Sequence, residues 1–171
     1  MLIYIHGFNS APHSFKARIT GERMRALGLE APEHAAWLRT LLVEFHRVTT
    51  HLAFLGGHPD LESESRAIRQ LRDEWVTLLQ DYAGTRMHTM LAVVGGVTRP
   101  PSSDWLNGVQ GLASRTREHS AGLVDAAAAT PGGEGIINQE AVTAWALSGP
   151  VARAAGVPID IRSDEPALRY A

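Results

Sequence analysis

The sequence contains no cysteine among its 171 residues. That absence excludes disulfide bonds, thiolate nucleophiles, zinc sites of the CxxC type and any iron–sulfur or nickel centre held by thiolates of this chain. If the protein takes part in electron transfer, other subunits must therefore hold the metal centres.

Long hydrophobic runs and an excess of one charge are also missing. No apolar run approaches the roughly 18–20 residues that cross a bilayer, and the N-terminus lacks the basic-then-apolar pattern of a signal peptide. A net charge of −2 gives no electrostatic reason to expect nucleic acid as a partner. Hydrophobic residues make up 44% of the chain, which is a globular value. We therefore expect a cytoplasmic protein that is either soluble or peripheral to a membrane.

The most regular hydrophobic pattern lies between residues 32 and 57. Its apolar side chains recur at steps of three and four, which places them along one side of a helix. They are Leu38, Leu41, Leu42, Phe45, Val48, Leu52 and Leu55. Pro32 suits the first turn, and Gly56 with Gly57 supplies a C-terminal stop. His34 and His46 of this helix are expected to be solvated, and Glu44, Arg47 and His51 are expected to form a salt-bridged face.

A second amphipathic pattern runs from about residue 62 to residue 83. Its apolar positions are Ile68, Leu71, Trp75, Leu78, Leu79 and Tyr82. Because only a short turn separates this pattern from the first, the sequence predicts two long antiparallel helices that share a core.

Shorter elements are predicted around this pair. We expect a short helix over about residues 20–27, a short β segment from His88 to Val97, and a third helix over about residues 104–129. Short helical segments over residues 139–146 and 151–155 precede an irregular tail. The third helix should turn Trp105, Leu106, Val109, Leu112, Leu123 and Val124 inward. The predicted fold class is therefore mainly α with a short β segment.

The first 19 residues have a different character. Leu2 to Ile5 is a short apolar run typical of a buried strand, and Gly7 then begins a loop. This opening resembles that of small α/β-hydrolase esterases of the YqiA-like kind. The Gly-x-Ser-x-Gly elbow that holds the serine nucleophile of such enzymes occurs nowhere in the sequence. We predict that residues 1–19 are a fused or unrelated segment ahead of a helical domain over residues 20–171, with esterase activity as the least favoured function.

Four further blocks carry a resemblance that covers most of the chain. They are Glu30 to Gly57 with Trp37, Arg39, Glu44, Arg47 and His51; Gly84 to His88, which reads GTRMH; Gly95 to Val97 followed by Trp105 and Leu106; and the segments Gly135–Ile136, Ser148–Pro150, Arg153–Val157 and Asp160–Arg162. In this order, over about residues 22–171, the blocks resemble the D subunit of respiratory complex I. That family is related to the large subunit of nickel–iron hydrogenases.

The resemblance implies a fragment of the hydrogenase large-subunit-like fold and a role in a proton-translocating NADH–quinone oxidoreductase. Such a subunit passes electrons to quinone from an iron–sulfur cluster held by a B-type partner subunit, and it reaches the inner or plasma membrane only through its partners. The resemblance places His88 beside that cluster, where it couples the redox state to protonation. An imidazole suits this task because an electron added nearby draws a proton to it. It also places Arg39, Arg86 and Arg153 close to the quinone or the cluster.

Two candidate sites have simpler structural alternatives. The family has an acidic residue that pairs with a quinone-site histidine, and Asp60 is its nearest counterpart, one position out of register. After Pro59, Asp60 is equally suited to cap the second helix. Without the resemblance, His88 would be an ordinary polar residue at the start of a strand. His51 and His58 are seven residues apart, but the glycines between them end the helix, so we expect no metal site.

Several quinone-site motifs of the family are missing from this sequence. They include the loop with Gly-Pro-Gln-His-Pro and the Leu-Asp-Tyr block, and the family's C-terminal third is absent as well. We therefore expect a partial or truncated subunit that is not active alone. The alternatives are a helical scaffold or interaction module without chemistry, and a hydrogenase large subunit, which the absence of cysteine disfavours.

Overall fold

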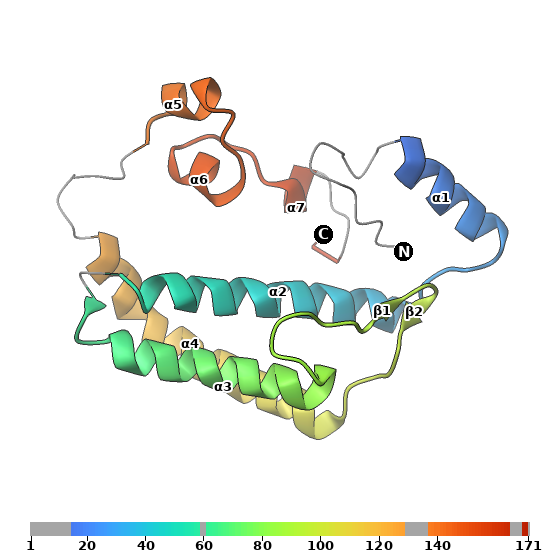
Figure 1. The fold of residues 1–171 in the computed structure, drawn as a ribbon, viewed down its shortest axis with the longest axis horizontal. Coiled ribbons are helices and arrows are strands. Elements are labelled where there is room, and N and C mark those ends of the chain that lie inside the picture. The colour runs from blue at the N-terminus through green and yellow to red at the C-terminus, as the bar shows by residue number, and fades with distance from the viewer. Residues whose placement is uncertain (1–14, 59–60, 129–136, 165–168, 171) are drawn as a thin grey trace. The chain divides into compact units, whose positions relative to one another are not determined.

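The computed structural model describes residues 15–58, 61–128, 137–164 and 169–170 (Figure 1). The chain divides into two compact units, Met1–Ala127 and Ala128–Ala171. Among the described residues the secondary structure consists of seven helices and one two-stranded sheet. The prediction of a mainly helical protein with a short β segment is confirmed. None of the described helices is long and apolar enough to cross a membrane.

The bounds of the elements follow the predicted pattern closely. They are α1 (Phe15–Ala26), α2 (Glu33–Leu55), α3 (Ser65–Ala83), β1 (Ala92–Val93), β2 (Gly96–Val97), α4 (Ser103–Ala128), α5 (Gln139–Ala144), α6 (Gly149–Ala154) and α7 (Ile161–Asp164). The helix predicted to begin near residue 20 begins at Phe15, so the domain boundary predicted after residue 19 falls inside α1 and stays a prediction. The tail, for which an irregular structure is predicted, contains the single turn of α7. Residues 1–14, which carry most of the esterase-like opening, lie outside the described residues.

The two long helices α2 and α3 run antiparallel, as predicted (Figure 1). Pro32 caps α2 in an extended conformation, and the chain leaves the helix at Gly56. The carbonyl oxygen of Gly56 accepts hydrogen bonds from Ser65 Oγ at 2.6 Å and from Arg69 Nη1 at 3.0 Å. The first turn of α3 thereby satisfies a carbonyl group at the end of α2, which would otherwise lack a partner.

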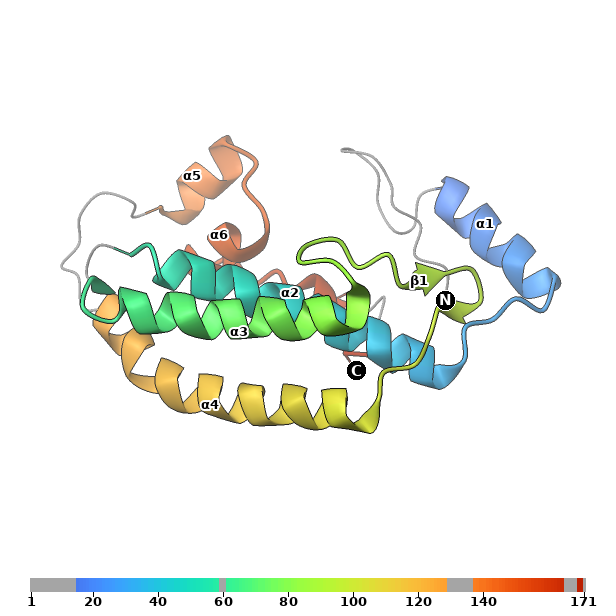
Figure 2. The same cartoon turned by 60° about the horizontal axis from the view of Figure 1, so that its bottom comes forward.

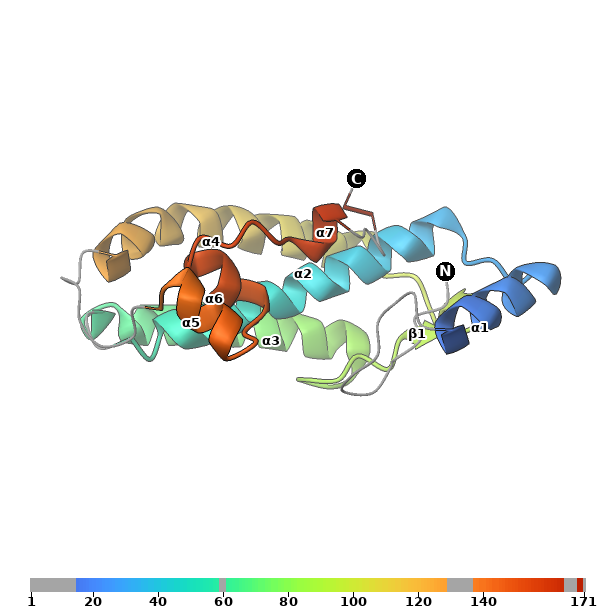
Figure 3. The ribbon, with the colours of Figure 1, turned by 90° about the horizontal axis from the view of Figure 1, so that it is seen from above.

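The helix α4 runs alongside this pair (Figures 2 and 3), and a layer of aromatic side chains joins the three helices. The Phe45 ring meets Trp75 edge-on at 4.6 Å between centroids and stacks on Trp105 at 6.1 Å. Both indole groups also donate hydrogen bonds across helices, Trp75 to Thr116 Oγ1 at 2.8 Å and Trp105 to the carbonyl of Leu78 at 2.7 Å. Buried aromatic rings with satisfied N–H groups combine a large apolar area with a fixed orientation.

The predicted core stripes are confirmed with one exception. Along α2 and α3 every predicted apolar side chain is buried or packed against the core. On α4, Leu106 is 42% exposed, so the prediction that it faces inward is wrong. Leu106 lies one helical step, about 100°, away from the stripe formed by Trp105, Val109 and Leu112. The side chain of Val124 lies outside the described ones.

Replacing Phe45 should show how much the aromatic layer stabilises the first unit. Phe45 is 1% exposed, and Phe45→Ala removes a ring that contacts two tryptophans, so we expect a loss of about 3–5 kcal/mol in the free energy of unfolding. Phe54 lies on the same helix and is 68% exposed, and Phe54→Ala should change that free energy by about 0.5 kcal/mol or less. Urea unfolding measures both, and equal losses for the two variants would contradict this account of the core.

Candidate functional site

The segment that follows α3 carries the predicted site residue His88. We call residues 85–90 the arch. Gly84 ends α3 in the left-handed conformation, with φ of +76°. The Thr85 hydroxyl donates to the carbonyl of His88 at 2.6 Å, and Arg86 forms an ion pair with Asp73 of α3. The arch is therefore tied to α3 at its beginning.

Beyond the arch, the chain is anchored again in the core and on α2. Leu91 is buried in the hydrophobic core. The chain then turns through Gly95, and β1 pairs with β2 so that Val93 lies opposite Gly96. A Cβ atom at Gly96 would lie 3.6 Å from the Pro32 ring, which shows how closely the hairpin approaches the start of α2.

Arg39 of α2 binds this hairpin directly. Its guanidinium Nη2 donates to the carbonyl of Val93 at 2.9 Å and to the carbonyl of Gly96 at 2.5 Å. The side chain is buried, and this burial lowers the pKa of Arg39 from its ordinary range. Arg39 thus holds both strands of the hairpin at one point, with a charged donor that makes each hydrogen bond stronger than a neutral one.

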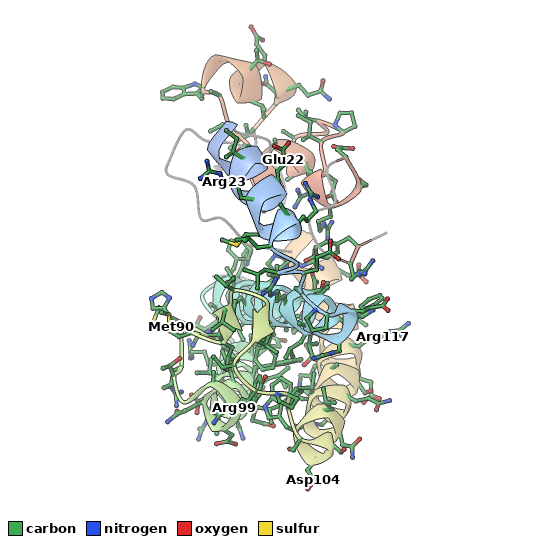
Figure 4. The ribbon with its side chains drawn as sticks, turned by 90° about the vertical axis from the view of Figure 1, so that its right-hand side faces the viewer. Glu22, Arg23, Met90, Arg99, Asp104 and Arg117 are labelled. Carbon is green, nitrogen blue, oxygen red and sulfur yellow. The ribbon has the colours of Figure 1, made fainter. Side chains whose placement is uncertain are left out.

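Between the two sets of anchors the arch is exposed. His88 is exposed, as are the side chains of Met87 at 70% and Met90 at 81%. Met90 lies at the outer edge of the first unit (Figure 4). His88 does not start a strand, because β1 begins only at Ala92. The result is an imidazole between two thioether side chains on a loop whose two ends are fixed.

His46 of α2 was not recognised as a site residue from the sequence. The prediction that it is solvated is wrong, since it is half-buried, whereas His34 is exposed as predicted. Burial lowers the pKa of His46, and the positive charge of protonated His88 lowers it further. The sequence offered one signal that His46 and Arg39 are related. His46 follows Arg39 by seven residues, or about two helical turns, so both side chains project from the same face of α2.

The remaining predicted site residues are placed elsewhere. Arg153 lies on α6 in the second unit, where it lines an open cavity of about 420 Å³ with Asp160 and Asp164. Asp60 lies outside the described residues. Arg39, Arg86 and His88 all belong to the first unit, and the two arginines fix the segment that carries the histidine.

A reciprocal contact between Tyr82 and Arg99 was also missed from the sequence. The Tyr82 hydroxyl donates to the carbonyl of Arg99 at 2.6 Å, the Arg99 guanidinium donates to the carbonyl of Tyr82, and its carbon lies 5.7 Å from the ring centroid. Burial raises the pKa of Tyr82, while the charge of Arg99 opposes this shift. The contact fixes the end of α3 to the linker that leads into α4.

The chemistry of the described side chains limits which groups this chain can hold. The described parts of the chain contain no group of three or more His, Asp or Glu side chains arranged to bind a metal ion. The sequence offers no thiolate for a cluster. Glu44 and Arg47 pair with each other on α2, as expected for a salt-bridged helix face, and His51 is exposed.

Comparison with known proteins gives one consistent family. The model of the family described as respiratory-chain NADH dehydrogenase, 49 Kd subunit, matches residues 65–171. One of the D-type NADH-quinone oxidoreductase subunits of Streptomyces coelicolor is 37% identical over 155 residues, which cover 85% of this chain and 40% of that protein. The corresponding D-type protein of Helicobacter pylori is 30% identical over 153 residues, which cover 84% of this chain and 37% of the relative. That of Bacillus cereus is 32% identical, with 84% and 42% covered.

These comparisons also bear on the extent of the chain and on its opening residues. The chain spans about 40% of the length of the curated relatives that it matches. The resemblance seen in the sequence motifs is confirmed, while nothing in the comparisons supports a hydrolase segment.

Replacing Arg39 should loosen the hairpin. Arg39→Lys keeps the charge but cannot reach both carbonyl groups in the same way, so we expect a loss of about 1.5–3 kcal/mol in the free energy of unfolding. Arg47→Lys on the same helix alters only a partly exposed ion pair and should cost less than about 1 kcal/mol. Chemical unfolding measures both variants, and a loss for Arg39→Lys as small as that for Arg47→Lys would contradict the proposed clamp.

Stability should depend on pH through His46. Because the pKa of His46 in the folded chain lies below its ordinary value of 6.5, the unfolded chain binds more protons in that range. The free energy of unfolding should therefore fall as the pH falls from about 7 through the folded-state pKa. His46→Gln should remove part of this slope, whereas His34→Gln should leave it unchanged. Urea unfolding between about pH 5 and pH 8 tests this, and an identical slope in both variants would overturn it.

Proposed function

The chain belongs to the family of the 49 kDa subunit of respiratory-chain NADH dehydrogenase, and from that premise we propose that it acts as a D-type subunit of an NADH–quinone oxidoreductase. In this role it lies against a partner subunit that holds an iron–sulfur cluster and helps to pass electrons from the cluster to quinone. His88 is the residue that faces the cluster. The observation that carries the proposal is the arch, which presents the GTRMH segment on a firmly anchored loop.

The exposure of the arch supports a contact with another protein. Met87 and Met90 are exposed apolar side chains that flank His88 along the arch, and methionine suits interfaces because its side chain adapts to the opposing surface. Anchoring at both ends lowers the entropy that the loop would lose on binding. An imidazole held against a partner's cluster is suited to take up a proton when the cluster is reduced.

The contacts of the two arginines indicate positioning roles. Arg86 is paired with Asp73, and Arg39 is buried against hairpin carbonyls. We infer that both hold the arch in place rather than touch quinone. Arg153 keeps the role near the quinone or cluster that the resemblance gave it, and Asp60 keeps its proposed pairing role.

Other subunits would have to supply the iron–sulfur cluster and part of the quinone-binding site. Without cysteine the chain cannot supply thiolate ligands, so the cluster belongs to a B-type partner. The cavities found near Tyr82 and near Arg153 do not include His88 in their walls. In this proposal a partner surface completes the quinone site, and the chain reaches the inner or plasma membrane only through its partners.

A non-catalytic scaffold is the second candidate function. It is favoured by the quinone-site motifs of the family that this sequence lacks. Such a module would use the same exposed arch to bind the partner but would carry no proton.

Redox titration of the co-purified complex separates these functions. We expect the chain to co-purify with the cluster-bearing B-type subunit, and the midpoint potential of the cluster to fall by up to about 59 mV per pH unit because one proton follows one electron. His88→Gln should flatten this dependence while the two subunits still co-purify, and the control His34→Gln should leave it unchanged. Co-purification with a pH dependence that His88→Gln does not alter would favour the scaffold, and failure to co-purify would contradict both functions.

A further inference from the structure

Two methionine side chains of the arch are open to solvent. Met87 is 70% exposed and Met90 is 81% exposed, and Figure 4 shows Met90 at the outer edge of the first unit. Of the other two methionines in the sequence, Met24 of α1 is only partly exposed, and Met1 lies outside the described residues. The described methionines that solvent reaches most freely therefore lie on either side of His88.

The anchors of the arch hold both side chains in this exposed position. Arg86, which directly precedes Met87, forms an ion pair with Asp73 and donates a hydrogen bond to Gln80 at 3.3 Å. Leu91, which directly follows Met90, is buried in the hydrophobic core. Each methionine is thus bonded to a residue whose place in the fold is fixed. A dissolved oxidant can reach both side chains without any unfolding of the chain.

Hydrogen peroxide is an oxidant suited to such exposed thioethers. The sulfur lone pair attacks one peroxide oxygen, so that an S–O bond forms and the O–O bond breaks. Sulfur gives up two electrons to the peroxide, and the second oxygen leaves as water with both peroxide protons. The product is methionine sulfoxide, which is polar where the thioether was apolar, and methionine sulfoxide reductases reverse the change.

We propose that Met87 and Met90 form an oxidation site that controls assembly: peroxide oxidation of the unassembled chain prevents the arch from docking on its cluster-bearing partner. This proposal rests on the partner contact of the proposed function. A thioether can be buried against a partner surface at little cost, whereas a sulfoxide oxygen buried there without a hydrogen-bond donor carries a desolvation penalty. In the assembled complex the partner covers both side chains, so the site acts before assembly.

Peptide mapping by mass spectrometry tests the oxidation site on the full chain alone. With limiting hydrogen peroxide, Met87 and Met90 should each gain one oxygen atom about twice as fast as Met24 or faster, because they are more exposed. Urea unfolding should give the same free energy before and after treatment, since neither side chain belongs to the core. Oxidation of Met24 at an equal or higher rate, or a loss of stability on treatment, would overturn the proposal.

Binding to the B-type subunit tests the control of docking. The chain is treated with hydrogen peroxide alone, and catalase removes the peroxide before mixing, so the partner's cluster never meets it. Oxidation should raise the dissociation constant about tenfold or more, and sulfoxide reductases should restore it. The double substitution Met87→Leu and Met90→Leu leaves no thioether on the arch, so treatment should not change its dissociation constant. The control Met24→Leu should remain as sensitive to treatment as the unsubstituted chain.

Each outcome of the binding experiment decides the proposal. Equal binding by the treated and untreated chain, or a loss that persists in the double substitution, would overturn it and leave the proposed function standing. If leucine at both positions weakens docking beyond measurement, recovery of the oxidised chain with sulfoxide reductases decides instead. Failure of the untreated chain to bind the B-type subunit would contradict the proposed function itself, and the control of docking would fall with it.

Discussion

The edge-on contact between Phe45 and Trp75 is the interaction on which the first unit depends. It joins the middle of α2 to the middle of α3, and Trp105 stacks on the same phenyl ring from α4. Aromatic pairs of this geometry fix orientation as well as bury area. Because three helices meet at one ring, the spacing of α2 and α3 is set, and with it the position of the end of α3, where the arch begins.

The arch is held by different forces from those that hold the core. Charged and backbone hydrogen bonds tie it down: Arg86 to Asp73, Arg39 to two carbonyl groups, and Thr85 to the carbonyl of His88. Leu91 is its buried link to the hydrophobic core. The imidazole of His88 and the thioethers of Met87 and Met90 are therefore exposed to solvent, while the backbone that carries them is well anchored. A surface of this kind can dock on a partner with little ordering, which fits a subunit whose cofactor lies in another chain.

The sequence was sufficient for the helices because their apolar side chains follow the helical period over many turns. Leu106 was misplaced because it directly follows Trp105, and a one-residue step decides which face a side chain takes. The hydrogen bonds of Arg39 could not be predicted, since they depend on a hairpin more than 50 residues away whose path no local pattern determines. For His88 the motif supplied the candidate, and the structure supplied its exposed, anchored loop.

In the function that we propose, this chain holds the His88 imidazole against a cluster that belongs to another subunit. A cryo-electron microscopy structure of the chain purified with its cluster-bearing partner tests this most directly. We predict that the arch is the part of the chain nearest the cluster, with the His88 ring facing it and the α2–α3 pair behind. A structure in which the cluster faces another surface of the chain, with the arch still in solvent, would contradict it.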